Sequence, residues 1–222
     1  MRLLSLAAFV LAASLATGAY ASVSGPVADF GAEQPSADAR FAVESILAKG
    51  GLDGRCFAVV DKNGARLYVF DQRGRLLGAA PVLLGQQVGD ATVPGVGDKQ
   101  PSDVLPNERT TPAGRFVTEP GRNIDGDSVI WVDYSASFAI HRVRAGASYA
   151  RRMQRLQARA SAAHRVSLGC VVVESDFFDH VVWPAFGRRA GVVYVLPETR
   201  PVASLFPPPS LAIADTKTSV TR

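Results

Sequence analysis

The sequence predicts a mainly β fold with a few helices. Short apolar runs of strand length recur between turn signals, beginning at residues 57–61, and β-branched and aromatic residues are frequent in them. Helical spacing of apolar residues is confined to stretches near residues 36–49, 142–165 and 176–182. With 222 residues, 47% of them hydrophobic, the chain is long enough to build one substantial core.

The N-terminus is typical of a secretory signal peptide over residues 1–21. A positive charge at Arg2 precedes an apolar run over residues 3–16, and an Ala-Tyr-Ala cleavage pattern ends at Ala21. The run is shorter than the roughly 20 apolar residues that a membrane-spanning helix needs, and no other segment is apolar enough to cross a bilayer. We therefore expect a secreted or periplasmic protein of the cell envelope, starting at Ser22.

A linker and a short helix are expected over residues 22–54. Proline and glycine occur repeatedly over residues 22–35, which favours an irregular linker. Ser36 is placed to cap a helix with apolar residues on one face, and the glycine pair after Lys49 is placed to end it.

An antiparallel meander is expected next. The strand over 57–61 leads through the hairpin-type turn Lys-Asn-Gly into a strand over 66–71, and residues 76–84 can form a third strand. Residues 85–109 are rich in glycine, proline and aspartate and predict a long loop. Loops of this length without secondary structure are usually functional or mobile.

Three further strands and an arginine-rich helix are expected in the middle of the chain. A turn over residues 110–116 leads into a strand, and residues 129–132 and 137–141 are strand candidates. Over residues 142–165 the apolar residues fall at helical spacing, and no acidic residue occurs. We interpret its arginines as a solvated helix face, with attraction of anionic carboxylates as the functional alternative. They are Arg142, Arg144, Arg151, Arg152, Arg155, Arg159 and Arg165.

The last third of the chain predicts a helix, a strand and a tail. Ser175 is placed to cap a helix that begins at residue 176, and Trp183-Pro184 is expected to end it. Residues 191–196 predict a last core strand. The segment 199–222 contains three consecutive prolines and is expected to be a disordered tail.

Charge and composition exclude several function classes. The formal net charge is +4 and the isoelectric point is near 9.3, but the basic residues do not form a broad patch interleaved with aromatics, so no nucleic-acid partner is expected. The two cysteines and three histidines lack metal-ligand spacing, and no glycine-rich phosphate loop is present. We therefore expect neither a metal nor another cofactor. The sequence leaves the oligomeric state open.

Cys170 is the candidate nucleophile. A free thiol has a pKa of about 8.5 and only the thiolate is strongly nucleophilic, so the residue needs a base. His141 lies in a separate β-rich segment and is the predicted base, with His164 as the alternative. His180, in the predicted last helix, is expected to be a packing or surface residue.

The other cysteine, Cys56, begins a predicted core strand and fits an inert buried thiol. Export into an oxidising compartment makes a Cys56–Cys170 disulfide the structural alternative.

His141 and the block Ser167-Leu168-Gly169-Cys170 together resemble the L,D-transpeptidase (YkuD-type) catalytic domain of bacterial cell-wall enzymes. The motif of that family is a histidine, a variable gap, then Ser/Thr-His-Gly-Cys, a hydrophobic residue and Asn. The chain departs from it at Leu168, where the family usually has His, and at Val172, where it has Asn. The gap between the histidine and the cysteine is also longer than usual.

Two more blocks carry the resemblance. Residues 111–116, Thr-Pro-Ala-Gly-Arg-Phe, are similar to the family's Thr-Pro-x-Gly-x-Phe turn, and residues 58–70 are similar to its first hairpin. The resemblance covers residues 55–198. It implies an L,D-transpeptidase-like β-sandwich with the catalytic cysteine in a cleft.

The resemblance implies a peptidoglycan-modifying cysteine acyl transferase whose partners are peptidoglycan stem peptides. Cys170 attacks the carbonyl of a meso-diaminopimelate–D-alanine bond, His141 takes the thiol proton, and D-alanine leaves. The resulting thioester passes to an amine or to water. The alternative is a catalytically weak or inactive cell-wall-binding envelope protein that keeps the fold, because Leu168 and Val172 replace polar groups beside the nucleophile.

The resemblance also implies the remaining site residues. The amides of Gly169 and Cys170 are expected to face the developing oxyanion, since glycine allows the backbone to approach the substrate closely. Ser167 and Leu168 are expected to form the wall of the site. Apart from the resemblance, Arg142 and Arg165 of the arginine-rich stretch are predicted to bind the substrate through their charge.

Overall fold

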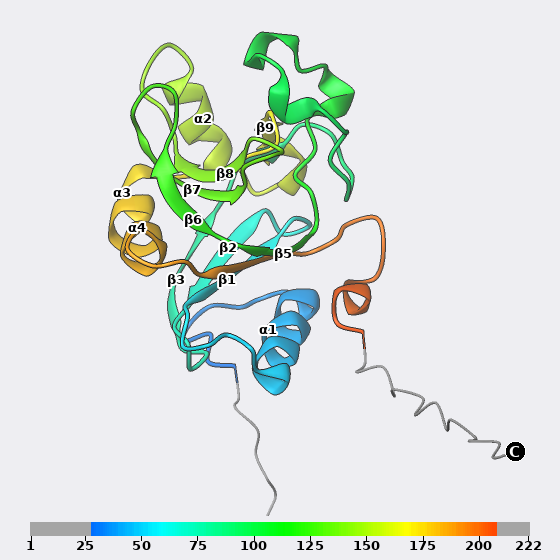
Figure 1. Cartoon of the computed structure of the whole chain (residues 1–222), viewed down its shortest axis with the longest axis vertical. Helices are drawn as coiled ribbons and strands as arrows, with labels where there is room; N and C mark the ends of the chain where they lie inside the picture. The colour runs from blue at the N-terminus through cyan, green and yellow to red at the C-terminus, as the bar shows by residue number, and fades with distance from the viewer. Residues whose placement is uncertain (1–27, 208–222) are drawn as a thin grey trace, which may run out of the picture.

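Two β-sheets pack face to face and hold the largest hydrophobic core between them in the computed structural model, which describes residues 28–207 (Figure 1). The predicted signal peptide and the last part of the predicted tail lie outside the described residues. Within those limits the fold is mixed, with more strand than helix. The predicted mainly β fold with a few helices is therefore confirmed at that level.

The first sheet has five strands in the order β3-β2-β1-β11-β5. The predicted meander of the first three strands is confirmed, and the last strand of the chain inserts parallel to β1. The bounds are β1 Phe57–Asp61, β2 Arg66–Phe70, β3 Leu76–Pro81, β5 Gly114–Val117 and β11 Val192–Val195.

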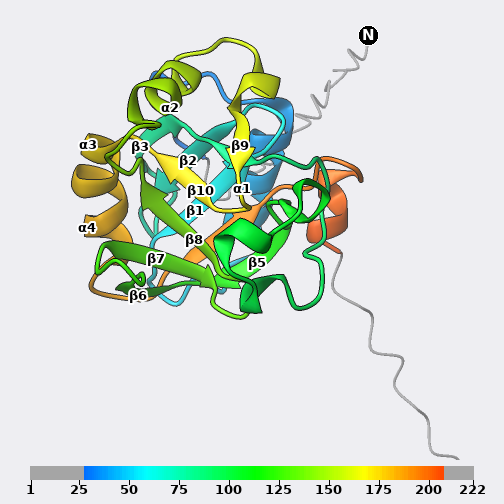
Figure 2. The same cartoon turned by 90° about the horizontal axis from the view of Figure 1, so that it is seen from above.

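The second sheet has four strands in the order β10-β8-β7-β6, and a two-stranded sheet joins β4 to β9. Figure 2 shows β8 and β10 side by side, and they pair in parallel with Val172 opposite His141. The bounds are β4 Leu84–Gly85, β6 Glu119–Arg122, β7 Ser128–Asp133, β8 Phe138–Arg142, β9 Arg165–Ser167 and β10 Val171–Val173.

Alternation along β8 decides which residues enter the core. Phe138 and Ile140 are buried between the two sheets, whereas Ala139 and His141 line a cavity on the other face of the sheet. Successive side chains of a strand point to opposite faces, so this assignment follows from the pleat.

Helix α1 (Ala37–Lys49) covers the outer face of the five-stranded sheet, as Figure 1 shows. Ser36 caps it as predicted, because its hydroxyl accepts a hydrogen bond from the amide of Ala39 at 3.0 Å. The helix ends at Gly50, whose φ of 65° lies in the left-handed region that favours glycine.

The structure describes part of the segment predicted as a linker over residues 22–35, and that part is irregular but packs against the first sheet. Asp29 forms a β-bridge with Arg75, and Phe30 is buried edge-on against the rings of Tyr68 and Phe70. The apolar area of one aromatic ring is enough to anchor an irregular segment that proline and glycine would otherwise leave free.

Two segments differ from their predicted secondary structure. Helix α2 spans Tyr149–Leu156 and is shorter than the predicted stretch, which continues into a 3₁₀ turn η4 (Ser161–His164). The predicted loop over 85–109 contains three short 3₁₀ turns. They are η1 (Val96–Asp98), η2 (Pro101–Asp103) and η3 (Pro106–Glu108).

The predicted helix stop at Trp183-Pro184 is wrong. The helix runs through α3 (Ser175–Phe177), a π-helical segment η5 (Phe178–Val182) and α4 (Trp183–Phe186), with Glu174 rather than Ser175 at the N-cap. Pro184 directly follows the π-helical segment and is the second residue of α4, so the helix continues past it.

The predicted disordered tail is also wrong in its first part. A 3₁₀ turn η6 (Val202–Leu205) follows the last strand, and Val202 and Phe206 are buried in the cluster beneath α1. The rings of Phe206 and Tyr194 stack with centroids 5.8 Å apart. None of the helices among residues 28–207 has the length and apolar character needed to cross a membrane.

Candidate active site

A cavity with a volume of about 720 Å³ lies beside β8 and β10. In Figure 1 α2 and the segment 85–109 rise on this same side of the molecule. Both Cys170 and His141 line the cavity, and so do the predicted wall residues Ser167, Leu168 and Gly169.

The register of two strands brings Cys170 and His141 to the same cavity. Val172 stands opposite His141 and Val171 stands opposite Ile140, so the cysteine directly before β10 lies beside the adjacent part of β8. The Cys170 Sγ is 3.5 Å from the carbonyl oxygen of Ser137, at the start of that strand.

A tight turn over residues 167–170 presents the cysteine. Gly169 has a φ of 140°, a conformation that side chains rarely adopt, and a Cβ placed on it would lie 2.9 Å from the carbonyl oxygen of Thr110. Glycine is therefore required by both backbone conformation and space. The Ser167 hydroxyl closes the turn by donating to the carbonyl of Cys170 at 2.7 Å and accepting from the amide of Gly169 at 3.1 Å.

These contacts modify two predictions from the resemblance. The Gly169 amide donates to the hydroxyl of Ser167, so it is not aimed at a substrate in this structure. The Ser167 side chain is turned to the backbone and is buried, with 8% of its surface exposed. The Cys170 amide is left as the candidate donor to an oxyanion.

His141 has a defined tautomer. Its Nδ1 lies 2.8 Å from the carbonyl oxygen of Arg142, and because a carbonyl only accepts, Nδ1 carries the proton and Nε2 has a free lone pair. Burial lowers the pKa of His141 to about 4, a hydrogen bond to the Arg142 carbonyl opposes the shift, and the nearby charges of Arg144 and Arg152 add to it. The imidazole is therefore neutral at neutral pH.

The Cys170 thiol is uncharged under the same conditions. Burial raises the pKa of the Cys170 thiol above its usual value, although a hydrogen bond from the amide of Ala139 and the charge of Arg144 act in the opposite direction. A neutral thiol beside a neutral imidazole suits proton transfer during attack, rather than a preformed thiolate–imidazolium pair.

Two apolar residues, Leu168 and Val172, lie beside Cys170 at positions where the L,D-transpeptidases that the sequence resembles have polar residues. Leu168 is 39% exposed at the cavity wall, whereas Val172 is almost fully buried in a cluster with Leu83, Val143 and Leu156. The exposed leucine is the more unusual of the two, because a large apolar side chain facing a cavity is available to contact a ligand.

The structure gives Arg142 and Arg165 other partners than a substrate in the cavity. The Arg142 guanidinium pairs with Asp179 and lies over the ring of Phe178 at 4.6 Å from its centroid. Arg165 pairs with Glu198. Neither arginine lines the cavity, so the prediction that they bind the substrate there is not supported by their positions.

Other arginines contribute to the wall of the cavity. Arg109, Arg144 and Arg152 line the cavity, and the last two are close enough to His141 to influence its pKa. Arg144 is paired with exposed Asp125 at 2.7 Å. The arginine-rich stretch of the sequence was the signal for Arg144 and Arg152, but sequence spacing did not separate them from the arginines that face elsewhere, and Arg109 lies outside that stretch.

The alternatives for the base and the disulfide are resolved by geometry. Both ring nitrogens of His164 contact backbone carbonyl oxygens, those of Val82 and Ala158, and the residue is buried outside the cavity lining. His180 is an exposed residue of the helix, as predicted. Cys56 and Cys170 are both free thiols, so the predicted disulfide alternative is wrong.

No metal site is apparent in the described part of the chain. Between residues 28 and 207, histidine, cysteine, aspartate and glutamate side chains do not gather in groups of three or more that could hold an ion.

No family model matches the sequence, and no curated protein matches it. Among solved structures, the chain is similar to the LD transpeptidase LdtMt1 in complex with imipenem, with 20% identity and a TM-score of 0.37 over 64% of this chain and 58% of that chain. It is also similar to a fused Zn-dependent amidase/peptidase/peptidoglycan-binding domain-containing protein from Clostridium acetobutylicum ATCC 824, with 17% identity and a TM-score of 0.35 over 73% of this chain and 64% of that chain. The chain therefore spans less than two thirds of both. Function has to be argued from the site and the sequence motifs.

Proposed function

We propose that the protein is a cysteine acyl transferase of the cell envelope that acts on peptidoglycan stem peptides, like the L,D-transpeptidases whose motifs its sequence resembles. The observation that carries the proposal is the placement of Cys170 and a neutral His141 in the lining of one cavity. The predicted signal peptide and the residues of the motif support the location and the substrate class.

The chemistry follows from the tautomer and the two uncharged groups. As the Cys170 Sγ attacks a peptide carbonyl, Nε2 of His141 accepts the thiol proton and later gives it to the leaving amine. A carbon–sulfur bond forms, the carbon–nitrogen bond breaks, and a thioester remains on the enzyme. An amine or water then attacks the thioester and releases Cys170.

The basic cavity wall supports an anionic substrate. Arg109, Arg144 and Arg152 line a space of about 720 Å³, which is within the range of cavities that hold small ligands. The lining also contains Asp98 and Glu108, and Glu108 is paired with Lys99, so the charge of the lining is positive on balance. Stem peptides carry carboxylates, and clustered positive charge raises the local concentration of such ligands. This replaces Arg142 and Arg165 as the groups proposed to meet the substrate.

The test is to incubate purified protein with tetrapeptide muropeptides and to follow both the products and the protein mass. We expect a mass increase equal to the acyl part of the donor on wild-type protein, release of D-alanine, and neither in a Cys170→Ala variant. Cys56→Ala is the matched control, since it removes a thiol outside the cavity, and it should behave as wild type. A Cys170→Ala variant that still releases D-alanine would falsify the proposal.

The second candidate is a binding protein that keeps the fold but turns over slowly. Exposed Leu168 in the cavity wall and the use of the Gly169 amide by Ser167 favour it, because both leave fewer polar groups around the reacting carbonyl. For this candidate, wild type and Cys170→Ala would bind sacculi equally and neither would release D-alanine.

A further inference from the structure

The buried hydroxyl of Thr111 makes a hydrogen bond to the turn over residues 167–170 that carries Cys170. Its Oγ1 donates a hydrogen bond to the carbonyl oxygen of Gly169 at 2.8 Å, and the residue is fully buried. Thr110 and Pro112 on either side line the cavity, whereas Thr111 does not, so it reaches the turn from behind rather than from the substrate side.

That hydrogen bond fixes the direction of another group. The carbonyl of Gly169 and the amide hydrogen of Cys170 belong to one peptide unit, which is planar and trans, as are all peptide bonds in the described chain. The amide hydrogen therefore points opposite to the carbonyl oxygen. While Thr111 holds the oxygen, the Cys170 amide faces away from Thr111.

The other amide that was expected to face the oxyanion already has a partner. The Gly169 amide donates to Ser167, which leaves the Cys170 amide as the candidate oxyanion donor within the turn. Donors aimed at a developing oxyanion contribute substantially to acyl-transfer rates only when they are held in place before the reaction. The orientation of the Gly169–Cys170 peptide therefore determines whether this amide can reach the oxyanion.

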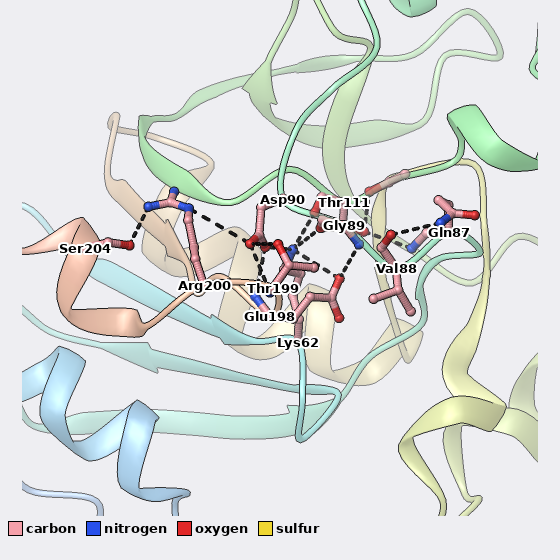
Figure 3. A network of polar contacts seen from close by, with 12 residues as sticks. Lys62, Gln87, Val88, Gly89, Asp90, Thr111, Glu198, Thr199, Arg200 and Ser204 are labelled. Carbon is pink, nitrogen blue, oxygen red and sulfur yellow. Dashed lines mark hydrogen bonds and ion pairs between the residues drawn. The ribbon is translucent and has the colours of Figure 1, made fainter.

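Three hydrogen bonds fix the position of Thr111. Its Oγ1 accepts from the amide of Gly85 at 2.8 Å while donating to Gly169, and its carbonyl accepts from the ammonium of Lys62 at 3.0 Å. Figure 3 shows Lys62 and Thr111 meeting in this network. A side chain with both donor and acceptor functions satisfied in a buried site has one favourable rotamer.

The Lys62 ammonium anchors this arrangement to two distant segments. It is fully buried and contacts Asp90 at 2.8 Å and Glu198 at 3.2 Å, together with the carbonyl oxygen of Gly89 (Figure 3). Arg165 pairs with the same Glu198 and donates to the carbonyl of Lys62. The network thus joins the base of the 85–109 segment, the strand that leads to the cysteine, and the C-terminal segment.

We propose that Thr111 is a positioning residue for acyl transfer, which orients the Gly169–Cys170 peptide so that the Cys170 amide can stabilise the oxyanion. The proposal rests on the proposed function and adds to it a residue that contacts neither substrate nor thiol. The proposal predicts different effects of Thr111 on two reactions of the Cys170 thiol. Attack on a carbonyl needs the amide donor, whereas displacement of a halide from a saturated carbon does not.

The test compares both reactions in a Cys56→Ala background, so that Cys170 is the reacting thiol. With 4-nitrophenyl acetate a carbon–sulfur bond forms, 4-nitrophenolate leaves, and the enzyme is acetylated. With iodoacetamide a carbon–sulfur bond forms and iodide leaves. Thr111→Val removes the hydroxyl at nearly constant volume, and Thr111→Ser keeps it.

In Thr111→Val we expect the rate constant for acetylation to fall by about tenfold, with the alkylation rate constant within twofold of the parent protein. Thr111→Ser should keep both rate constants within twofold. Thr111→Ala removes the same hydroxyl with a smaller side chain and provides the measurement if the valine variant does not fold.

Three outcomes overturn the proposal. Equal losses in both reactions would show general damage to the site, and no loss in either would show that the hydroxyl is dispensable. If Cys170 of the parent protein reacts with iodoacetamide but not with the ester, the positioned donor is absent although the thiol is reactive. If it reacts with neither reagent, the proposed function fails first, and the two failures are thereby distinguished.

Discussion

Two groups of charged side chains lie on either side of residues 110–112, and they are built in opposite ways. Behind this segment, Lys62, Asp90, Glu198 and Arg165 are partly or fully buried and each has a partner of opposite charge. In the cavity in front of it, Arg152 has no ion pair among the residues that the structure describes, and Arg144 has only the exposed Asp125.

The paired charges of the buried network contribute to stability, whereas the charges of the cavity are available for chemistry. Buried charges persist only when they are paired and hydrogen-bonded, and the network behind the segment meets that condition. Burial alone would raise the pKa of Asp90, but hydrogen bonds from Lys62 and Thr199 hold it below its usual range. The cavity instead keeps positive charges and two uncharged reactive groups available to a ligand, as functional sites often do.

The largest expected effect breaks the network. Lys62→Met should lower the free energy of unfolding by about 3–5 kcal/mol, because Asp90 and Glu198 would lose their buried cation. Urea denaturation measures the loss. Lys99→Met is the matched control, since Lys99 pairs with Glu108 near the surface, and it should cost about 1 kcal/mol or less. Equal losses in the two variants would contradict the contrast between network and surface pair.

The next effect concerns the uncharged imidazole of the cavity. The folded pKa of His141 is about 4 and the unfolded value is about 6.5, so on acidification the unfolded chain binds the proton first. The stability that comes from burying neutral His141 is present above pH 6.5 and is lost as the pH falls towards 4, by at most about 3 kcal/mol.

Denaturation at pH 7.5 and 4.5 measures that loss, and His141→Gln should remove this part of the pH dependence. The acid limb of kcat/KM should likewise lie near pH 4 rather than 6.5, because the base must be neutral to act. An unchanged pH dependence of stability in His141→Gln would show that other groups cause it.

A smaller effect tests the backbone between the two regions. Gly169→Ala should cost about 2 kcal/mol of stability, since an alanine at a φ of 140° is strained and its Cβ would meet Thr110. Gly95→Ala is the control, because Gly95 has a φ of 77° with open space around its Cβ, and should cost about 1 kcal/mol. Thermal unfolding of both variants distinguishes strain alone from strain with contact.

The smallest expected effect concerns substrate attraction. Arg152→Gln should lower kcat/KM for an anionic stem peptide by about threefold at low ionic strength, and the difference should shrink at high salt. Arg151→Gln changes a neighbouring exposed arginine that does not line the cavity, and it should leave the rate unchanged. Identical losses in both variants would indicate a general charge effect instead.

Most of the first sheet could be predicted from the sequence because its strands are apolar runs bounded by turn residues. Strand β6 (Glu119–Arg122) was missed, since Glu-Pro-Gly-Arg contains none of the residues that favour strands. It is tolerated because it lies at the edge of its sheet, where proline can occur. The burial of Phe206 was missed for a related reason, as an isolated aromatic carries no periodicity.

The site could be located from the sequence, but its charged wall could not. Cys170 and His141 were identified by their motif, and the predicted cavity residues around the cysteine do line it. Arg142 was predicted to bind the substrate. It follows His141 in β8, and because adjacent residues of a strand face opposite sides, its side chain lies over Phe178 and not in the cavity.

The pairing of β11 with β1 affects when the protein can fold. These strands come from opposite ends of the described chain. Strand β11 lies between β1 and β5, so it connects the edge strand β5 to the meander. The five-stranded sheet therefore cannot be completed until β11 has been synthesised, and such non-local pairing slows folding.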